Sequence, residues 1–216
     1  MVSIFKKKKI FLGKYEVAAL KACHHPNVVK IIKKNKYALY FKKYENTLLD
    51  VLPLNEDLIH LYLKQILEGL TEIHMQNFIH HDIKPENLFI DDNKIIVGDL
   101  GSCLPVNIDN NTLHFVGSHN YCAPEKILGN FTEVKSDIWS LGILLYQMIT
   151  NKLIFEGYNC LEVCDLLGNH DRLKKFIENK LQQLYVSEEL KTIIESCLTI
   201  NIDTRITVFD LLSKLK

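Results

Sequence analysis

Four polar residues in the middle of the chain have the types and the spacing that phosphoryl transfer requires. Asp82 is followed by Lys84 two residues later and by Asn87 five residues later, and Asp99 comes just after an apolar run at 94–97. A carboxylate can accept a hydroxyl proton, an ammonium can neutralise phosphoryl oxygens, and an amide oxygen with a second carboxylate can hold Mg²⁺. Either acid alone could be an ordinary turn or capping residue. The four together predict a phosphoryl-transfer site.

The composition indicates one globular domain in a reducing compartment. With 216 residues, 47% of them apolar, and few glycines or prolines, the chain can bury a sizeable core. Its six cysteines form no CxxC pair, and its N-terminus lacks the basic-then-apolar order of a signal peptide. The longest apolar stretch, Ile138–Ile149, is too short to cross a bilayer. We therefore expect an intracellular protein, cytoplasmic or nuclear, with no membrane anchor.

Charge is distributed unevenly along the chain although the total is zero. Residues 1–43 contain twelve lysines and one acidic residue, and the remainder is correspondingly acidic. A basic N-terminal part could attract an acidic partner. Solvated lysines on short strands explain the same pattern more simply, and there is no clear nucleic-acid signal.

The hydrophobic pattern predicts a small strand-bearing part followed by a larger helical part. Apolar runs at 28–32 and 37–41 suit two paired strands, and a helix over 14–23 precedes them. From Leu58 to His74 the apolar residues line one helical face. The boundary between the two parts lies near 44–54. Further helices are expected over Asp137–Thr150, Leu161–Leu167, Asp171–Leu184, Glu188–Leu198 and Val208–Leu215.

Several segments in the order seen here resemble the signature of the eukaryotic protein kinase family. Residues 80–87, HHDIKPEN, resemble H-R-D-x-K-x-x-N, and residues 99–101, DLG, resemble D-F-G. Three later segments extend the resemblance: APE at 123–125, DIWSLG at 137–142 similar to D-x-W-S-x-G, and NIDTR at 201–205 similar to D-P-x-x-R.

The resemblance implies an α+β, protein-kinase-like fold of two lobes and an enzyme that uses ATP and Mg²⁺. Residues 1–216 would form a single domain, with a reduced N-lobe over 1–44, a hinge region over 45–54 and a mainly helical C-lobe over 55–216. Asp82 would be the catalytic base, Lys84 would contact the phosphoryl group, and Asn87 and Asp99 would hold Mg²⁺.

Two further features of the resemblance concern the substrate and the stability of the fold. Lys84, two residues after Asp82, resembles the serine/threonine branch, and Ser118 resembles the Ser/Thr that positions the substrate hydroxyl against the base. The predicted acceptor is a Ser or Thr hydroxyl of a protein. Arg205 is expected to pair with Glu125, and losing one partner of such a buried pair costs about 3–5 kcal/mol.

The N-terminal part resembles the family less completely. Glu16 precedes HPNVV at 25–29 at the spacing of the glutamate that partners the ATP-anchoring lysine. Lys6 is the candidate for that lysine, and Lys7 or Lys8 could serve instead if the strand register slips. Phe41 resembles the gatekeeper residue before the segment that binds adenine.

The sequence departs from the family pattern before Glu16 and at two positions of the motifs. No G-x-G-x-x-G motif precedes Glu16, and Gly13 is the only glycine among the first 68 residues. Either the kinase is reduced, with a nucleotide more open to water and weaker catalysis, or the protein starts upstream of Met1. His81 and Leu100 replace the arginine of H-R-D and the phenylalanine of D-F-G, and neither change removes a reacting group.

A serine/threonine kinase is the first hypothesis, because Asp82, Lys84, Asn87 and Asp99 are all kept. The alternative is a weak or inactive kinase-like module that binds or inhibits another kinase.

Overall fold

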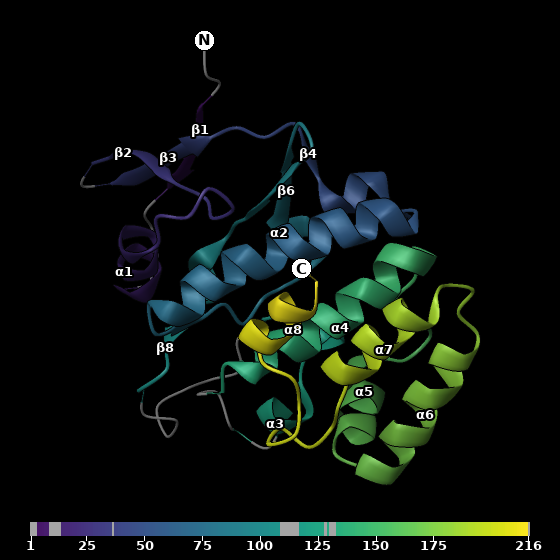
Figure 1. The fold of residues 1–216 in the computed structure, drawn as a ribbon. Helices are drawn as coiled ribbons and strands as arrows, with labels where there is room; N and C mark the ends of the chain where they lie inside the picture. Colours follow the sequence, from purple (N-terminus) through teal and green to yellow (C-terminus); the bar gives the residue numbers. More distant parts are fainter. Residues whose placement is uncertain are drawn as a thin grey trace.

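A small sheet with one helix and a larger body of helices make up the molecule (Figure 1). The computed structural model describes residues 4–8, 14–35, 37–108, 117–127, 129 and 133–215, with backbone only for 4–8. The predicted α+β architecture is confirmed. None of the described helices is long and apolar enough to cross a membrane.

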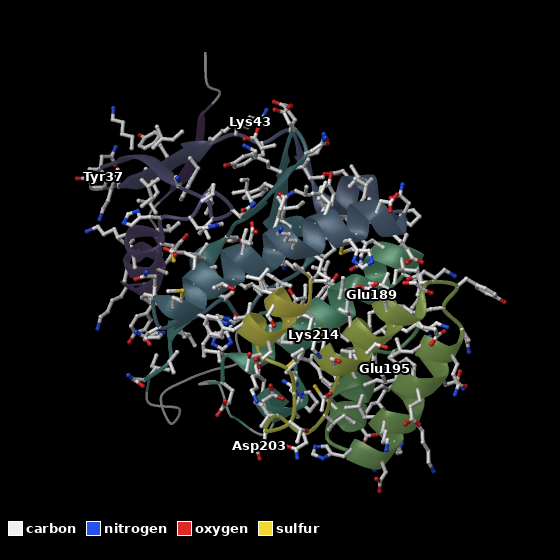
Figure 2. All side chains as sticks on the ribbon, in the orientation of Figure 1. Tyr37, Lys43, Glu189, Glu195, Asp203 and Lys214 are labelled. Carbon is white, nitrogen blue, oxygen red and sulfur yellow. The ribbon has the colours of Figure 1, made fainter. Side chains whose placement is uncertain are left out.

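Three antiparallel strands form the N-terminal sheet, in the order β1-β3-β2. They are β1 (Ile4–Lys8), β2 (Ile31–Lys34) and β3 (Ala38–Lys42). Helix α1 (Lys14–Ala22) accounts for the expected helix and buries Glu16, Ala19 and Leu20. Tyr37 projects from the β2–β3 turn at the outer end of this sheet (Figure 2).

The prediction of a strand over 28–32 is only partly right. Val28 forms a parallel bridge with Val97 in the helical part, and the Val29 amide donates to the Val97 carbonyl at 2.9 Å. The apolar run therefore serves two partners in succession, first the larger body and then β3. Its first residues tie the two parts of the molecule together instead of lengthening the hairpin.

Helices α2 and α4 form the centre of the larger body. Helix α2 (Glu56–Met75) begins where the Asn55 side chain accepts a hydrogen bond from the Leu58 amide. Helix α4 (Lys135–Thr150) is buried over nearly its whole length. Gly142 lets α4 approach the next helices closely, because a Cβ there would lie 2.7 Å from the Leu198 side chain. Around these two lie α3 (Pro124–Ile127), α5 (Cys160–Leu167), α6 (His170–Gln182), α7 (Glu188–Cys197) and α8 (Val208–Lys214).

The helices expected from the sequence are therefore confirmed, with ends displaced by at most two residues.

Asp82 and Asp99 lie between short strands and single helical turns, which hydrophobic periodicity does not predict. Strands β4 (Asn46–Thr47), β6 (Leu88–Asp91) and β7 (Lys94–Val97) form one small sheet, and β5 (Phe78–Ile79) pairs with β8 (Leu104–Pro105). Single turns of 3₁₀ helix are η2 (Leu48–Val51), η3 (Pro85–Asn87), η4 (Leu100–Ser102) and η6 (His119–Tyr121). The loop that contains Asp82 thus runs between β5 and β6, and Asp99 follows β7.

The expected ion pair between Glu125 and Arg205 is confirmed and buried. The guanidinium donates from Nη1 to Oε1 at 2.7 Å and from Nη2 to Oε2 at 2.9 Å, and Arg205 lies over the ring of Trp139. Burial alone would raise the pKa of Glu125, but the hydrogen bonds and charge of Arg205, with a hydrogen bond from Ser136, lower it below its usual value. The pair fastens α3 to the segment before α8.

Candidate active site

Asp82 lies at the centre of a hydrogen-bonded group of four side chains. Its Oδ1 accepts from the Ser118 hydroxyl at 2.8 Å, and its Oδ2 accepts from Asn87 Nδ2 at 2.9 Å. Lys84 Nζ lies 3.1 Å from Asp82 Oδ2 and donates to Ser118 Oγ at 2.8 Å. Asp82 is therefore placed to accept a proton from a hydroxyl, with an ammonium beside both groups.

A buried carboxylate holds the backbone of this loop. Asp137, on α4, accepts from the amides of His80 and His81 at 2.8 Å each, and it lies 2.9 Å from His74 Nε2. Burial by itself would raise the pKa of Asp137, but the hydrogen bond and charge of His74 hold it well below its usual range. The carboxylate stays ionised and fixes the two residues that precede Asp82.

A cavity of about 450 Å³ opens next to this group, between the N-terminal sheet and the larger body. This volume is within the range of small-molecule sites. Apolar side chains and a few polar groups share its wall. The lining residues are Glu16, Leu20, Val29, Phe41, Lys42, Lys43, Tyr44, Glu86, Asn87, Phe89, Asp99 and Leu100.

Asn87 and Asp99 line the same cavity and suit a hard divalent cation. The Asn87 amide nitrogen donates to both the carbonyl and the carboxylate of Asp82, which leaves its amide oxygen for another partner. Asp99 is exposed, with a left-handed backbone at φ 47°, and its Oδ1 accepts from the Gly101 amide at 3.3 Å. Carboxylate and amide oxygens are ligands that Mg²⁺ accepts. The residues present therefore fit Mg²⁺.

Aromatic rings give the cavity a flat wall that the sequence analysis did not single out. Phe89 and Tyr44 stack with ring centroids 5.1 Å apart and planes 7° apart. Gly98 makes room for Phe89, because a Cβ at that position would lie 2.2 Å from the ring. The signal in the sequence is an aromatic residue two positions after Asn87, on the strand face opposite Leu88.

The structure assembles most of the residues that the sequence singled out. Glu16, which is 3% exposed, and Phe41, at the end of β3, both line the cavity. The connection between the two parts reaches the cavity through Lys42, Lys43 and Tyr44, just before the predicted hinge region at 45–54.

Lys6 stays a prediction. Its backbone pairs with Tyr40 across the sheet, but its side chain lies outside the described residues. The same holds for the alternatives Lys7 and Lys8.

Comparison with known proteins gives a match over almost the whole chain. Residues 4–215 match the family model described as "Protein kinase domain". Cyclin-dependent kinase F-3 of Oryza sativa subsp. japonica is 28% identical over 191 residues, 79% of this chain and 44% of the relative. Protein kinase 2 of Dictyostelium discoideum is 28% identical over 219 residues, 94% of this chain and 43% of the relative.

A third relative, the probable serine/threonine-protein kinase nek2 of Dictyostelium discoideum, is 35% identical over 176 residues, 71% of this chain and 41% of its own length. The chain spans less than half the length of these relatives.

The α+β scaffold, with Asp82 on a short loop beside a cavity that Asn87 and Asp99 line, agrees with this match. The chain belongs to the protein kinase family. Membership implies ATP, typically with Mg²⁺, and a protein substrate.

Proposed function

We propose that this chain is a serine/threonine protein kinase, which transfers the γ-phosphate of ATP to Ser or Thr hydroxyls of proteins. The observation that carries the proposal is the hydrogen-bonded group of Asp82, Lys84, Asn87 and Ser118 beside the cavity. A base and a cation within hydrogen-bond distance of one hydroxyl are the groups that phosphoryl transfer to a hydroxyl needs.

Each residue has a role that follows from its contacts. Asp82 takes the proton of the acceptor hydroxyl. At the same time the hydroxyl oxygen bonds to the γ-phosphorus, and the bond between that phosphorus and the ADP oxygen breaks. Lys84 neutralises charge on the transferring group, and Ser118 holds Asp82 in orientation through the 2.8 Å hydrogen bond. Asn87 and Asp99 would hold Mg²⁺, which supplies charge neutralisation at the phosphates when bound.

The nucleotide would lie against the apolar and aromatic wall of the cavity. Phe89 and Tyr44 offer a stacked pair of rings to a flat base, and Phe41 is also part of the cavity lining. Glu16 would orient the lysine that contacts the phosphates, for which Lys6 is the candidate. These assignments rest on the cavity lining and on the family pattern.

Three observations support Ser and Thr as acceptors. Lys84 is two residues after Asp82, as in the serine/threonine branch, and Ser118 contacts both residues. One relative is named as a probable serine/threonine-protein kinase.

The test is transfer of label from γ-labelled ATP, with Mg²⁺, to a generic basic protein, followed by identification of the labelled amino acid. Wild type is compared with Asp82→Asn and with Asp92→Asn, an exposed acid at φ 56° in the β6–β7 turn, where Asn is equally well tolerated. We expect label on Ser or Thr, a loss of ~10²–10⁴-fold in Asp82→Asn, and no change in Asp92→Asn. Label on Tyr would contradict the proposed acceptor, and equal label from Asp82→Asn would contradict the proposed mechanism.

A second function is a kinase-like module that binds or inhibits another kinase without transferring phosphate. Such a module would need no glycine-rich phosphate loop, and residues 1–15 contain no G-x-G-x-x-G. In that case wild type would bind ATP or a partner but transfer no label, and Asp82→Asn would keep the full biological effect. An acidic partner would suit the exposed lysines of β2, Lys33 and Lys34.

A further inference from the structure

His81, the residue before Asp82, has a backbone that must be held in place from outside. Its φ is 66°, in the left-handed region that costs free energy for any residue with a Cβ. Such a conformation persists only where surrounding contacts determine it. The His81 amide is held by Asp137 at 2.8 Å. The carbonyl of the same residue, which forms the peptide bond to Asp82, needs a second anchor.

The His81 side chain cannot be that anchor. It is 3% exposed, and neither ring nitrogen has a hydrogen-bond partner in the part of the chain that the structure describes. Burial, and then the nearby charge of Lys126, lower the pKa of His81 to about 3. The ring is neutral at physiological pH and contributes packing alone.

Lys126, on α3, reaches the carbonyl. The residue is 4% exposed, and its Nζ donates to the His81 carbonyl oxygen at 3.3 Å. A lysine is rarely buried to this degree without a defined partner. Burial lowers the pKa of Lys126 from its usual value, while the carboxylates of Asp137 and Asp82 act in the opposite direction.

Gly117, the residue before Ser118, covers the same carbonyl. It has φ 92°, and a Cβ there would lie 2.2 Å from the His81 oxygen and 3.4 Å from Lys126 Nζ. The backbone of Gly117 therefore packs closely against the His81 carbonyl, next to Lys126 Nζ. Gly117 directly precedes Ser118, which donates to Asp82, so the chain segment that orients the carboxylate passes next to the His81 carbonyl.

We propose that Lys126 is a positioning residue for phosphoryl transfer, whose ammonium holds the His81–Asp82 peptide so that the Asp82 carboxylate faces the acceptor hydroxyl. This inference rests on the proposed kinase function. Position 81 is an arginine in the family pattern and a neutral histidine here, and Lys126 would supply a buried positive charge next to it. Lys126 does not line the cavity, so its loss should leave nucleotide binding in place.

The test compares wild type with Lys126→Met, which keeps the length of the side chain without the charge, and Lys126→Arg, which keeps the charge. Lys174→Met, at an exposed lysine of α6, is the control. For each protein, ATP binding is titrated for stoichiometry and affinity, and kcat and KM are measured by label transfer. Amide hydrogen exchange is followed in peptides that span 78–90.

We expect Lys126→Met to bind one ATP with affinity within twofold of wild type, and to lose ~10-fold or more in kcat. The 78–90 peptides should exchange at least about tenfold faster while peptides of α4 keep their protection. Lys126→Arg should recover part of kcat, and Lys174→Met should match wild type.

Two results would overturn the inference. The first is that Lys126→Met has the same kcat and the same hydrogen exchange as wild type. The second is that Lys126→Met binds fewer ATP molecules per chain while kcat per bound site is unchanged, which would indicate a structural role only. If wild type itself transfers no label, the proposed function fails. The exchange experiment then still decides whether Lys126 anchors the loop.

Discussion

Replacing Arg205 with Met should cost far more stability than the same change at Arg172, although both residues form an ion pair at 2.7 Å. Arg205 is 1% exposed and donates to Glu125, while Arg172 pairs with Asp165 through side chains that are 60% and 67% exposed. Both pairs join an arginine to a carboxylate at the same distance, but they differ in burial and in the further hydrogen bonds that Arg205 makes. Comparing them therefore contrasts a buried, fully hydrogen-bonded arginine with an exposed one.

The magnitude follows from the hydrogen bonds that Arg205 makes. Its Nε donates to the Thr199 carbonyl at 2.8 Å, and its two Nη atoms donate to the Lys135 and Ile200 carbonyls at 2.9 and 3.3 Å, besides the two bonds to Glu125. Without the guanidinium, the Glu125 carboxylate would stay buried with its hydrogen bond from Ser136 as a remaining partner. The expected loss in free energy of unfolding is about 3–5 kcal/mol, a large part of the total for a typical domain.

Urea unfolding at pH 7, with linear extrapolation, measures both variants. Arg172→Met should change the free energy of unfolding by less than about 0.5 kcal/mol. The double variant Arg205→Met with Glu125→Gln should lose less than the sum of the two single variants, because it leaves no unpaired buried charge. Equal losses at Arg205 and Arg172, or strict additivity in the double variant, would refute the reasoning.

Three further predictions concern the catalytic loop and the cavity. In the first, the folded pKa of His81, about 3, lies below the unfolded value near 6.5, so its contribution to stability is present above pH 6.5 and is lost as the pH falls toward 3. Lowering the pH from 7 to 5 should therefore reduce the free energy of unfolding, measured in urea, by ~2 kcal/mol more in wild type than in His81→Leu; equal reductions in the two proteins would contradict this. In the second, Gly117→Ala should cost clearly more stability than Gly157→Ala, because both have φ near 90° but the second has open space around its Cβ; equal losses in urea would argue against the close approach to His81. In the third, Phe89→Ala should raise the Kd for ATP ~10-fold, measured by titration, whereas an unchanged Kd would exclude stacking on the Tyr44–Phe89 pair.

Local patterns in the sequence were sufficient to predict the helices and the polar residues of the loop. The helix over 58–74 extends by two residues at its start and one at its end, because Asn55 caps it earlier than the first apolar residue indicates. Sequence spacing also brought Asp82, Lys84 and Asn87 together, since all three lie within one short loop.

Contacts between distant segments were beyond such patterns. The bridge from Val28 to Val97 shortened a predicted strand, and periodicity gives no sign of it. The hydrogen bond from Lys126 to His81 joins residues 45 positions apart. From the sequence alone, a lysine after the A-P-E segment would be expected on the surface. Tertiary packing determines both, and it overrides local preference where the two conflict.

The most direct test of the whole account is label transfer from γ-labelled ATP by wild type and by Asp99→Asn, with and without Mg²⁺. Asp99 lines the cavity and is exposed, so the substitution removes a charge without leaving a hole in the core. The account predicts Mg²⁺-dependent label on Ser or Thr from wild type and a loss of about 10²-fold or more in Asp99→Asn. Equal label from both proteins, or none from wild type, would contradict it.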